Sequence, residues 1–105
     1  TCALPIPKPS EYPPVDRDLS FIVPQGFDAA RLTNVLQTYG GELLSQLTLY
    51  DVYEGQPIET GKKSLTYALR FISPERTLTE REIDDIVQQI VRVAKEQFGA
   101  TLREE

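Results

Sequence analysis

Two short clusters of polar and aromatic residues carry the side chains of this sequence that are best suited to binding. Asp51 and Tyr53 end one apolar, β-branched stretch, and Lys62, Lys63 and Ser64 begin the next one. If these stretches are adjacent antiparallel strands, the clusters lie side by side, and Ser64 can share a face with Asp51 and Tyr53. An aromatic ring can stack on an unpaired base, Asp and Ser can hydrogen-bond to base edges, and lysines can meet phosphates. The alternative is ordinary sheet surface, with Tyr53 covering the core.

The sequence shows no arrangement of residues typical of a catalytic centre or of a zinc site. Histidine is absent, so neither a Ser-His nor a Cys-His pair can form. The pair Gly40 and Gly41 lacks the spacing and the following lysine of a phosphate-binding loop. Because Cys2 is the only cysteine, a zinc site is not expected either. We therefore expect no catalytic residue, no metal site and no cofactor within this segment.

Size and charge narrow the class of protein further. A chain of 105 residues fits one domain, and the lack of methionine predicts that it starts inside a longer gene product or has been processed. The single cysteine fits a reducing, cytoplasmic location. The sequence contains no apolar run of about 18 residues, so we expect no membrane-spanning helix in it. A net charge of -5 disfavours generic binding to nucleic acid, DNA included, because affinity for a polyanion comes largely from Lys and Arg. An RNA role therefore requires a local basic or stacking surface.

Periodicity predicts the element order β-α-β-β-α-β after a proline-rich arm. Prolines at 5, 7, 9, 13 and 14 mark residues 1–14 as a linker or arm, which leaves 15–105 as the folded domain. The helix starts are the clearest signals, because Asp28 is a good N-cap and Thr79 with Glu82 forms a capping box. The predicted elements are strand 18–23, helix 29–39, strand 43–53, strand 64–72, helix 80–98 and a short strand 100–103.

This order is typical of an α+β ferredoxin-like sandwich, in which two helices pack on a four-stranded antiparallel sheet. Both helices follow strands through right-handed crossovers, so we expect them on the same face of the sheet. The other face would be bare, or covered only by the arm. A bare face that carries Asp, Ser, Thr, Arg and Tyr is a surface available for binding.

Four separate stretches of the chain resemble one known family. They are 12–21 (YPPVDRDLSF), 49–53 (LYDVY), 61–65 (GKKSL) and 74–79 (PERTLT). They are similar, in order and in spacing, to the ferredoxin-fold anticodon-binding domain, which closes the β subunit of bacterial phenylalanyl-tRNA synthetase and the single-chain mitochondrial enzyme. The resemblance runs from Tyr12 to Arg103. One departure is Tyr50, where phenylalanine is commoner, and a buried phenol there would need a hydrogen-bond partner.

The resemblance assigns the site residues by position. It implies a sheet surface that receives the anticodon stem-loop of phenylalanine tRNA, with a guanine stacked on Tyr53 and with Asp51 and Ser64 beside it. Four cations are candidates for contacts with the RNA backbone: Lys62, Lys63, Arg17 and Arg70. In an alternative interpretation, two arginines are structural: Arg17 would pair with Asp18, and Arg76 with Glu75.

The resemblance also implies that this segment is a tRNA-binding module and not an enzyme by itself. The parent would be a phenylalanine–tRNA ligase, an α2β2 assembly whose catalytic α subunit uses ATP and magnesium. Two other classes share the topology and stay open, an ACT-like regulatory domain that binds a small molecule and a dimerisation module. The turn 24–26 matches the glycine-bearing turn of ACT domains only loosely. An acylphosphatase-type enzyme is rejected, because Asn34, the only asparagine, lies inside a predicted helix.

Overall fold

The computed structural model describes residues 12–103, so the predicted arm 1–14 lies outside the described residues except for 12–14. The elements are β1 (Val15–Pro24), α1 (Ala29–Gly40), the short 3-10 helix η1 (Gly41–Leu43), β2 (Leu44–Tyr53), β3 (Lys62–Phe71), α2 (Glu80–Phe98) and β4 (Thr101–Leu102). The predicted order is confirmed, but β1 begins before residue 18. The alternation of apolar residues is hidden there, because the charged residue Arg17 occupies a position on the core side of the strand.

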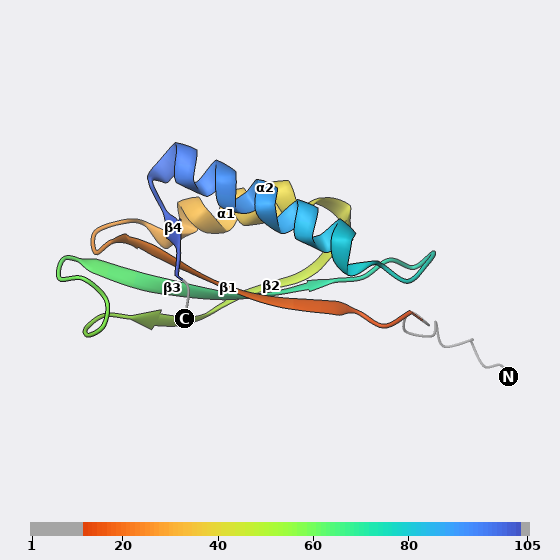
Figure 1. Cartoon of the computed structure of the whole chain (residues 1–105), viewed down its shortest axis with the longest axis horizontal. Helices are drawn as coiled ribbons and strands as arrows, with labels where there is room; N and C mark the ends of the chain where they lie inside the picture. Colours follow the sequence, from red (N-terminus) through yellow and green to blue (C-terminus); the bar gives the residue numbers. More distant parts are fainter. Residues whose placement is uncertain (1–11, 104–105) are drawn as a thin grey trace, which may run out of the picture.

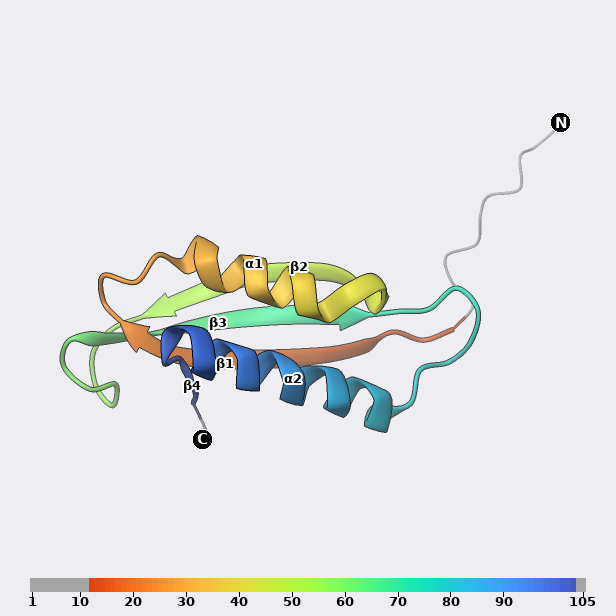
Figure 2. The same ribbon diagram turned by 90° about the horizontal axis from the view of Figure 1, so that it is seen from above.

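The four strands form one antiparallel sheet in the order β2-β3-β1-β4, and both helices pack on the same face of it (Figure 1). Seen from above, α1 lies toward β2 and α2 lies toward β1 (Figure 2). This arrangement is the ferredoxin-like sandwich that the element order predicted. The strand β4 is very short and pairs only with Phe21 and Ile22 of β1.

The core fills the space between the sheet and the two helices. Its largest members on the sheet are Phe21, Tyr67 and Phe71, which have no exposed surface. The rings of Phe21 and Tyr67 meet edge to face, with centroids 6.4 Å apart. The helices contribute a further buried set: Leu32, Leu36, Ile83, Ile90 and Ala94. Burial of these side chains holds both helices against one face of the sheet.

Local signals explain where α1 and α2 begin and end. Asp28 accepts a hydrogen bond from the Ala30 amide at 3.0 Å, as an N-cap does. The predicted capping box is confirmed, because the Glu82 amide donates to the Thr79 hydroxyl at 3.2 Å and the Thr79 amide donates to the Glu82 carboxylate at 2.9 Å. Gly99 ends α2 with a left-handed φ of 69°. Within residues 12–103, neither helix is long and apolar enough to cross a bilayer.

Tyr67 joins β3 to α1 through a polar contact inside the core. Its hydroxyl shares a hydrogen bond with the Thr33 hydroxyl at 2.8 Å and donates toward the Ala29 carbonyl oxygen at 3.3 Å. Burial raises the pKa of the Tyr67 phenol, and the Thr33 bond opposes that rise. We expect Tyr67→Phe to lower the free energy of unfolding by about 1 kcal/mol in urea titrations. The control Tyr39→Phe alters a partly exposed residue and should cost less; equal stabilities of wild type and Tyr67→Phe would contradict the argument.

Candidate nucleic-acid interface

The sheet face opposite the helices, which we call the open face, carries polar side chains from three strands. Its residues are Asp16, Asp18, Ser20 and Ile22 of β1, Gln46, Thr48, Asp51 and Tyr53 of β2, and Lys62, Ser64, Thr66, Ala68 and Arg70 of β3. They share a face because cross-strand partners point the same way, while the alternate residues of β1 and β3 form the core. Both helices lie on the other side of the sheet (Figure 1). The open face is therefore accessible to a partner.

A register irregularity in β2 determines which of its residues reach the open face. Leu49 pairs with a core residue of β3, and strict alternation from it would turn Asp51 and Tyr53 toward the helices. The register shifts between Leu49 and Asp51, so that Tyr50 is an extra residue, as in a β-bulge. Beyond the shift, Tyr53 pairs with Ser64 on the open face. The bulge therefore brings together the three residues that the sequence predicted to share a face.

Tyr53 ends β2 with 39% of its surface exposed, next to the loop 54–61. Its hydroxyl donates a hydrogen bond to the backbone carbonyl of Gln56 in that loop. The side-chain amide of Gln25 holds the loop from β1, because it donates to the Glu54 carboxylate at 2.7 Å. Sequence reasoning missed Gln25 and Glu54, since nothing in their local pattern indicates a contact between residues so far apart. The ring is thus supported on one side and open to solvent on another.

Ser64 lies beside Tyr53 but is fully buried in this structure. It has no exposed surface, and no described residue forms a hydrogen bond with its Oγ. Its other cross-strand partner is Ile22. Two register positions along, the hydroxyls of Ser20 and Thr66 share a hydrogen bond at 2.7 Å. The predicted hydrogen-bonding serine is therefore in the right place, but it is covered.

From the sequence, Tyr50 would need a hydrogen-bond partner if its phenol were buried. Tyr50 is the bulged residue, and its phenol is not buried. It is 55% exposed, so its phenol is not enclosed in the core. A shallow groove on the open face extends from it, and the groove is lined by Asp18, Ser20, Asp51 and Thr66 among others. Polar groups therefore continue from the end of β2 toward β1, which gives a ligand more than one point of contact.

The two predicted lysines differ in what they can reach. Lys62 lies on the open face, with 47% of its side chain exposed and its ammonium 3.3 Å from the Glu59 carboxylate. Lys63 points the other way, and its ammonium donates to the Phe27 carbonyl oxygen at 2.9 Å. Lys62 can therefore turn to a phosphate near Tyr53. Lys63 instead secures the turn between β1 and α1, so its assignment to the RNA backbone is not supported by its position.

Arg70 lies on the open face but far from Tyr53. Six residues of β3, roughly 20 Å, separate it from Ser64. Its guanidinium donates to both carboxylate oxygens of Asp16, at 2.8 and 3.0 Å. The Arg70 hydrogen bond lowers the pKa of the Asp16 carboxyl. Arg70 is therefore too far from Tyr53 for the two side chains to contact the same nucleotide.

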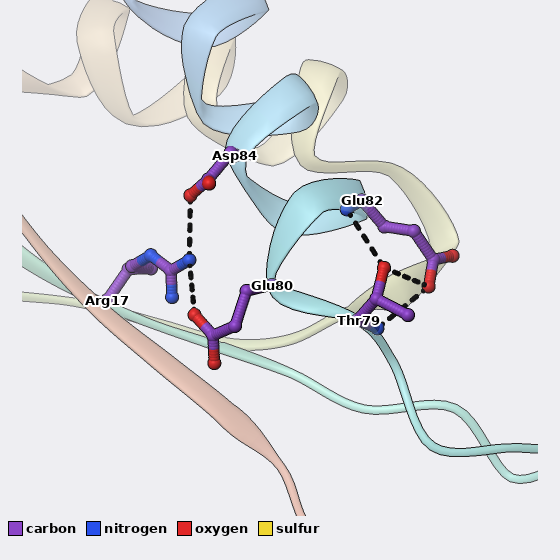
Figure 3. A network of polar contacts seen from close by, with 5 residues as sticks. All are labelled: Arg17, Thr79, Glu80, Glu82 and Asp84. Carbon is purple, nitrogen blue, oxygen red and sulfur yellow. Dashed lines mark hydrogen bonds and ion pairs between the residues drawn. The ribbon is translucent and has the colours of Figure 1, made fainter.

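Arg17 is not part of the open face, so its predicted contact with the RNA backbone is not supported by its position. Its side chain is on the helix side, where one guanidinium nitrogen is 2.8 Å from Glu80 Oε1 and 2.8 Å from Asp84 Oδ1 (Figure 3). Its role is therefore structural, since it ties β1 to the first turns of α2. The proposed partner Asp18 is replaced by these two carboxylates, because neighbouring strand residues point to opposite faces.

Arg76 is structural as well, and its partner is Glu82 instead of Glu75. Two guanidinium nitrogens of Arg76 donate to the two carboxylate oxygens of Glu82. The Arg76 bonds and the Thr79 amide lower the pKa of Glu82 from 4.5 to about 2. A carboxyl with a lowered pKa stabilises the fold above its ordinary pKa, and this contribution is lost as the pH falls toward the lowered value. The window for Glu82 is therefore pH 4.5 down to about 2.

In urea titrations across that pH window, we expect the unfolding midpoint of the wild type to fall as the pH falls. Glu82→Gln removes the titrating carboxylate, so its midpoint should start lower and change less between the same two pH values. Glu96→Gln, at an exposed position near the end of α2, is the matched control and should follow the wild type. Parallel curves for wild type and Glu82→Gln would show that this pair does not couple to folding.

Comparison with known proteins agrees with this geometry. Residues 10–103 match the model of the family described as the ferredoxin-fold anticodon binding domain. The chain is 46% identical over 99 residues to the phenylalanine–tRNA ligase β subunit of Nocardia farcinica, and 43% identical over 100 residues to that of Moorella thermoacetica. It is 39% identical over 99 residues to that of Bacillus licheniformis. These alignments cover 94%, 95% and 94% of this chain, respectively, and 12% of each relative.

The chain belongs to the ferredoxin-fold anticodon-binding domain family, because the family match covers nearly all of it. It spans about one-eighth of the length of the ligase β subunits that it matches. The family match favours the RNA-binding interpretation of the open face over the ACT-like alternative with the same topology.

Proposed function

We propose that the open face binds the anticodon stem-loop of phenylalanine tRNA, and that one unpaired base, a guanine, stacks on Tyr53. The observation that carries the proposal is the presence of Asp51, Tyr53 and Ser64 at adjacent strand ends on the face without helices, in a chain of this family. A partly exposed tyrosine ring at such a position offers a π-face to a base. Single-stranded loops are the parts of RNA whose bases can be splayed out onto such a ring.

Asp51 gives the site its preference for guanine. Its side chain is exposed and shares the open face with Tyr53. An ionised carboxylate only accepts hydrogen bonds, and the Watson–Crick edge of guanine presents two neighbouring donors, N1–H and the amino group. Adenine and cytosine present an acceptor at the ring nitrogen of that edge, which would face the carboxylate unfavourably. The hydroxyl of Ser64 can either donate or accept, so it adds affinity more than selectivity.

Few cations remain for the phosphates, so the affinity should depend only weakly on salt. Of the four predicted cations, Lys63 and Arg17 are engaged on the helix side, which leaves Lys62 near Tyr53 and Arg70 farther along the sheet. Arg103 also lines the groove beside Tyr50. Each phosphate contact contributes about -0.7 to the slope of log affinity against log salt for a single strand, so two or three contacts give a slope of roughly -1.5 to -2. The net charge of -5 weakens binding further. In a complete ligase, other parts would supply most contacts to the tRNA.

The test is a titration of the 105-residue chain with the anticodon stem-loop of phenylalanine tRNA, beside the same stem with a scrambled loop. A third RNA replaces the anticodon guanine by adenine. We expect the native loop to bind most tightly at both low and moderate salt, because contacts to bases are screened less than contacts to phosphates. Equal weak binding of all three RNAs would overturn the proposal. Tight binding of a free amino acid in calorimetry would instead support a regulatory domain.

We also propose that the complete protein is the β subunit of a phenylalanine–tRNA ligase. The similarity to ligase β subunits from three organisms supports this assignment. Such an enzyme would pair the β subunit with a catalytic α subunit as α2β2 in the cytoplasm, and would use ATP and magnesium. Because the open face would hold only tRNA, altering it in the complete enzyme should raise the KM for tRNA and leave the KM for phenylalanine unchanged. A change confined to the KM for phenylalanine would contradict this role.

A further inference from the structure

The burial of Ser64 conflicts with a direct role in binding unless a neighbouring side chain moves. Its Oγ is fully buried and has no hydrogen-bond partner among the described residues. A buried hydroxyl without a partner is destabilising, because it has lost water and gained nothing in return. A ligand that bonded this hydroxyl would relieve that cost, but it cannot reach the oxygen in the arrangement seen in this structure.

Of the two cross-strand neighbours of Ser64 on the open face, Tyr53 has more room to move. The two same-face, cross-strand partners of Ser64 are Ile22 on β1 and Tyr53 on β2. Directly opposite residues of an antiparallel pair have Cβ atoms about 5 Å apart, so a tyrosine easily covers a serine. Ile22 lies in the interior of the sheet, between β3 and β4. Tyr53 ends an edge strand and is partly exposed, so it has room to turn.

The loop 54–61 holds the end of the Tyr53 side chain. The Tyr53 hydroxyl donates to the carbonyl of Gln56, and a Cβ added at Gly55 would lie 3.7 Å from the same hydroxyl. The loop is itself anchored, because Ile58 is only 6% exposed and the backbone N–H of Gln25 donates to the Gly61 carbonyl oxygen at 3.0 Å. The acceptor for Tyr53 therefore has a fixed position, and the ring end is attached to it.

We propose that this structure is the closed form of the site, in which the Gln56 carbonyl holds Tyr53 over Ser64, and that an RNA base enters as Tyr53 leaves that carbonyl and uncovers the Ser64 hydroxyl. The Gln56 backbone carbonyl is then a positioning group, which acts on the RNA through Tyr53. The inference rests on the proposed function, and it adds a free-energy cost for breaking the bond between Tyr53 and the Gln56 carbonyl before a base can bind. Apparent affinity is reduced by the fraction of molecules that are closed, so weakening the closed form must tighten binding.

Tyr53→Phe separates this mechanism from one in which the loop simply prepares the ring for stacking. It keeps the stacking ring and removes the hydroxyl that bonds the Gln56 carbonyl. Because one hydrogen bond contributes about 0.5–1.5 kcal/mol net, we expect Tyr53→Phe to bind the anticodon stem-loop about 2- to 10-fold more tightly than the wild type. Binding that is unchanged, or weaker than that of the wild type, would overturn the proposal. Tyr39→Phe, at a phenol on α1, is the matched control and should bind like the wild type.

Two further measurements distinguish the closed form from a general effect on structure. Ser64→Ala should weaken stem-loop binding and leave the free energy of unfolding unchanged or raised, because it removes an unpaired buried hydroxyl. The carbonyl ¹³C chemical shift of Gln56 should move in the same direction in Tyr53→Phe and in the wild type saturated with stem-loop, and not in Tyr39→Phe. A Gln56 shift unaffected by RNA, or full affinity in Ser64→Ala, would overturn the closed form. Lack of discrimination between native and scrambled loops by the wild type would instead reject the proposed function itself.

Discussion

Tyr53→Ala is expected to weaken binding of the anticodon stem-loop by about 1–3 kcal/mol, roughly 5- to 150-fold, because it removes the ring on which the base stacks. The fold should survive, since Tyr53 ends an edge strand and is 39% exposed. The measurement is a titration monitored by fluorescence anisotropy of a labelled stem-loop, with urea unfolding of the same variant to confirm that it is folded. The effect should be larger for the native loop than for a scrambled loop.

The adjacent residue Val52 provides the matched control for Tyr53. It is 52% exposed, close to the same strand end, but it pairs with the core residue Leu65 and so faces the helix side of the sheet. Val52→Ala should therefore leave stem-loop affinity within about 2-fold of the wild type. Comparable losses in Val52→Ala and Tyr53→Ala would mean that the strand end, and not the ring on the open face, is responsible for binding.

Phe21→Ala is expected to give the largest loss of stability, about 3–5 kcal/mol in urea unfolding. The side chain is completely buried, packs edge to face on Tyr67, and lies where β1 pairs with both Leu65 of β3 and Leu102 of β4. A single-domain protein has a total stability of only about 5–15 kcal/mol, so this substitution removes a large fraction of it. Thermal unfolding followed by circular dichroism should show a strongly lowered Tm.

Two substitutions test whether this loss comes from core packing. Phe21→Leu fills most of the space and should cost about 1–2 kcal/mol. Ile22→Ala removes a neighbour on the open face, which is only half-buried, and should cost less than Phe21→Ala. If Ile22→Ala proved the more damaging of the two alanine variants, the assignment of β1 residues to core and open faces would be wrong.

Much of the fold could be predicted because local and long-range signals agree. The period-2 spacing of Leu19, Phe21 and Val23 identified the core side of β1, and the Thr79–Glu82 pattern identified the start of α2. The early part of β1 was missed because Arg17 interrupts the apolar alternation. Its compensating carboxylates, Glu80 and Asp84, lie on another element, and nothing near Arg17 in the sequence indicates them.

The site residues could be predicted in part, since their grouping follows from the antiparallel pairing of β2 with β3. The face of the sheet on which Asp51 and Tyr53 lie relative to Leu49 could not be predicted. It depends on the extra residue between Leu49 and Asp51, and no glycine or proline marks a bulge there. The directions of the two lysines were missed because the predicted strand began at residue 64, so that alternation was not extended to them. Lys62 and Lys63 are neighbours in the chain, yet only one of them reaches the open face.

The bulge at Tyr50 makes the strand end unequally tolerant of shortening. Because Tyr50 is supernumerary, its loss would leave a regular strand in which Asp51 and Tyr53 emerge on the same side as before. Loss of Val52 would instead turn the Tyr53 ring to the helix side, although Asp51, Tyr53 and Ser64 would all still be present in the sequence. Two homologous chains that differ by one residue in this stretch can therefore be aligned meaningfully only if the gap is placed at the position of Tyr50.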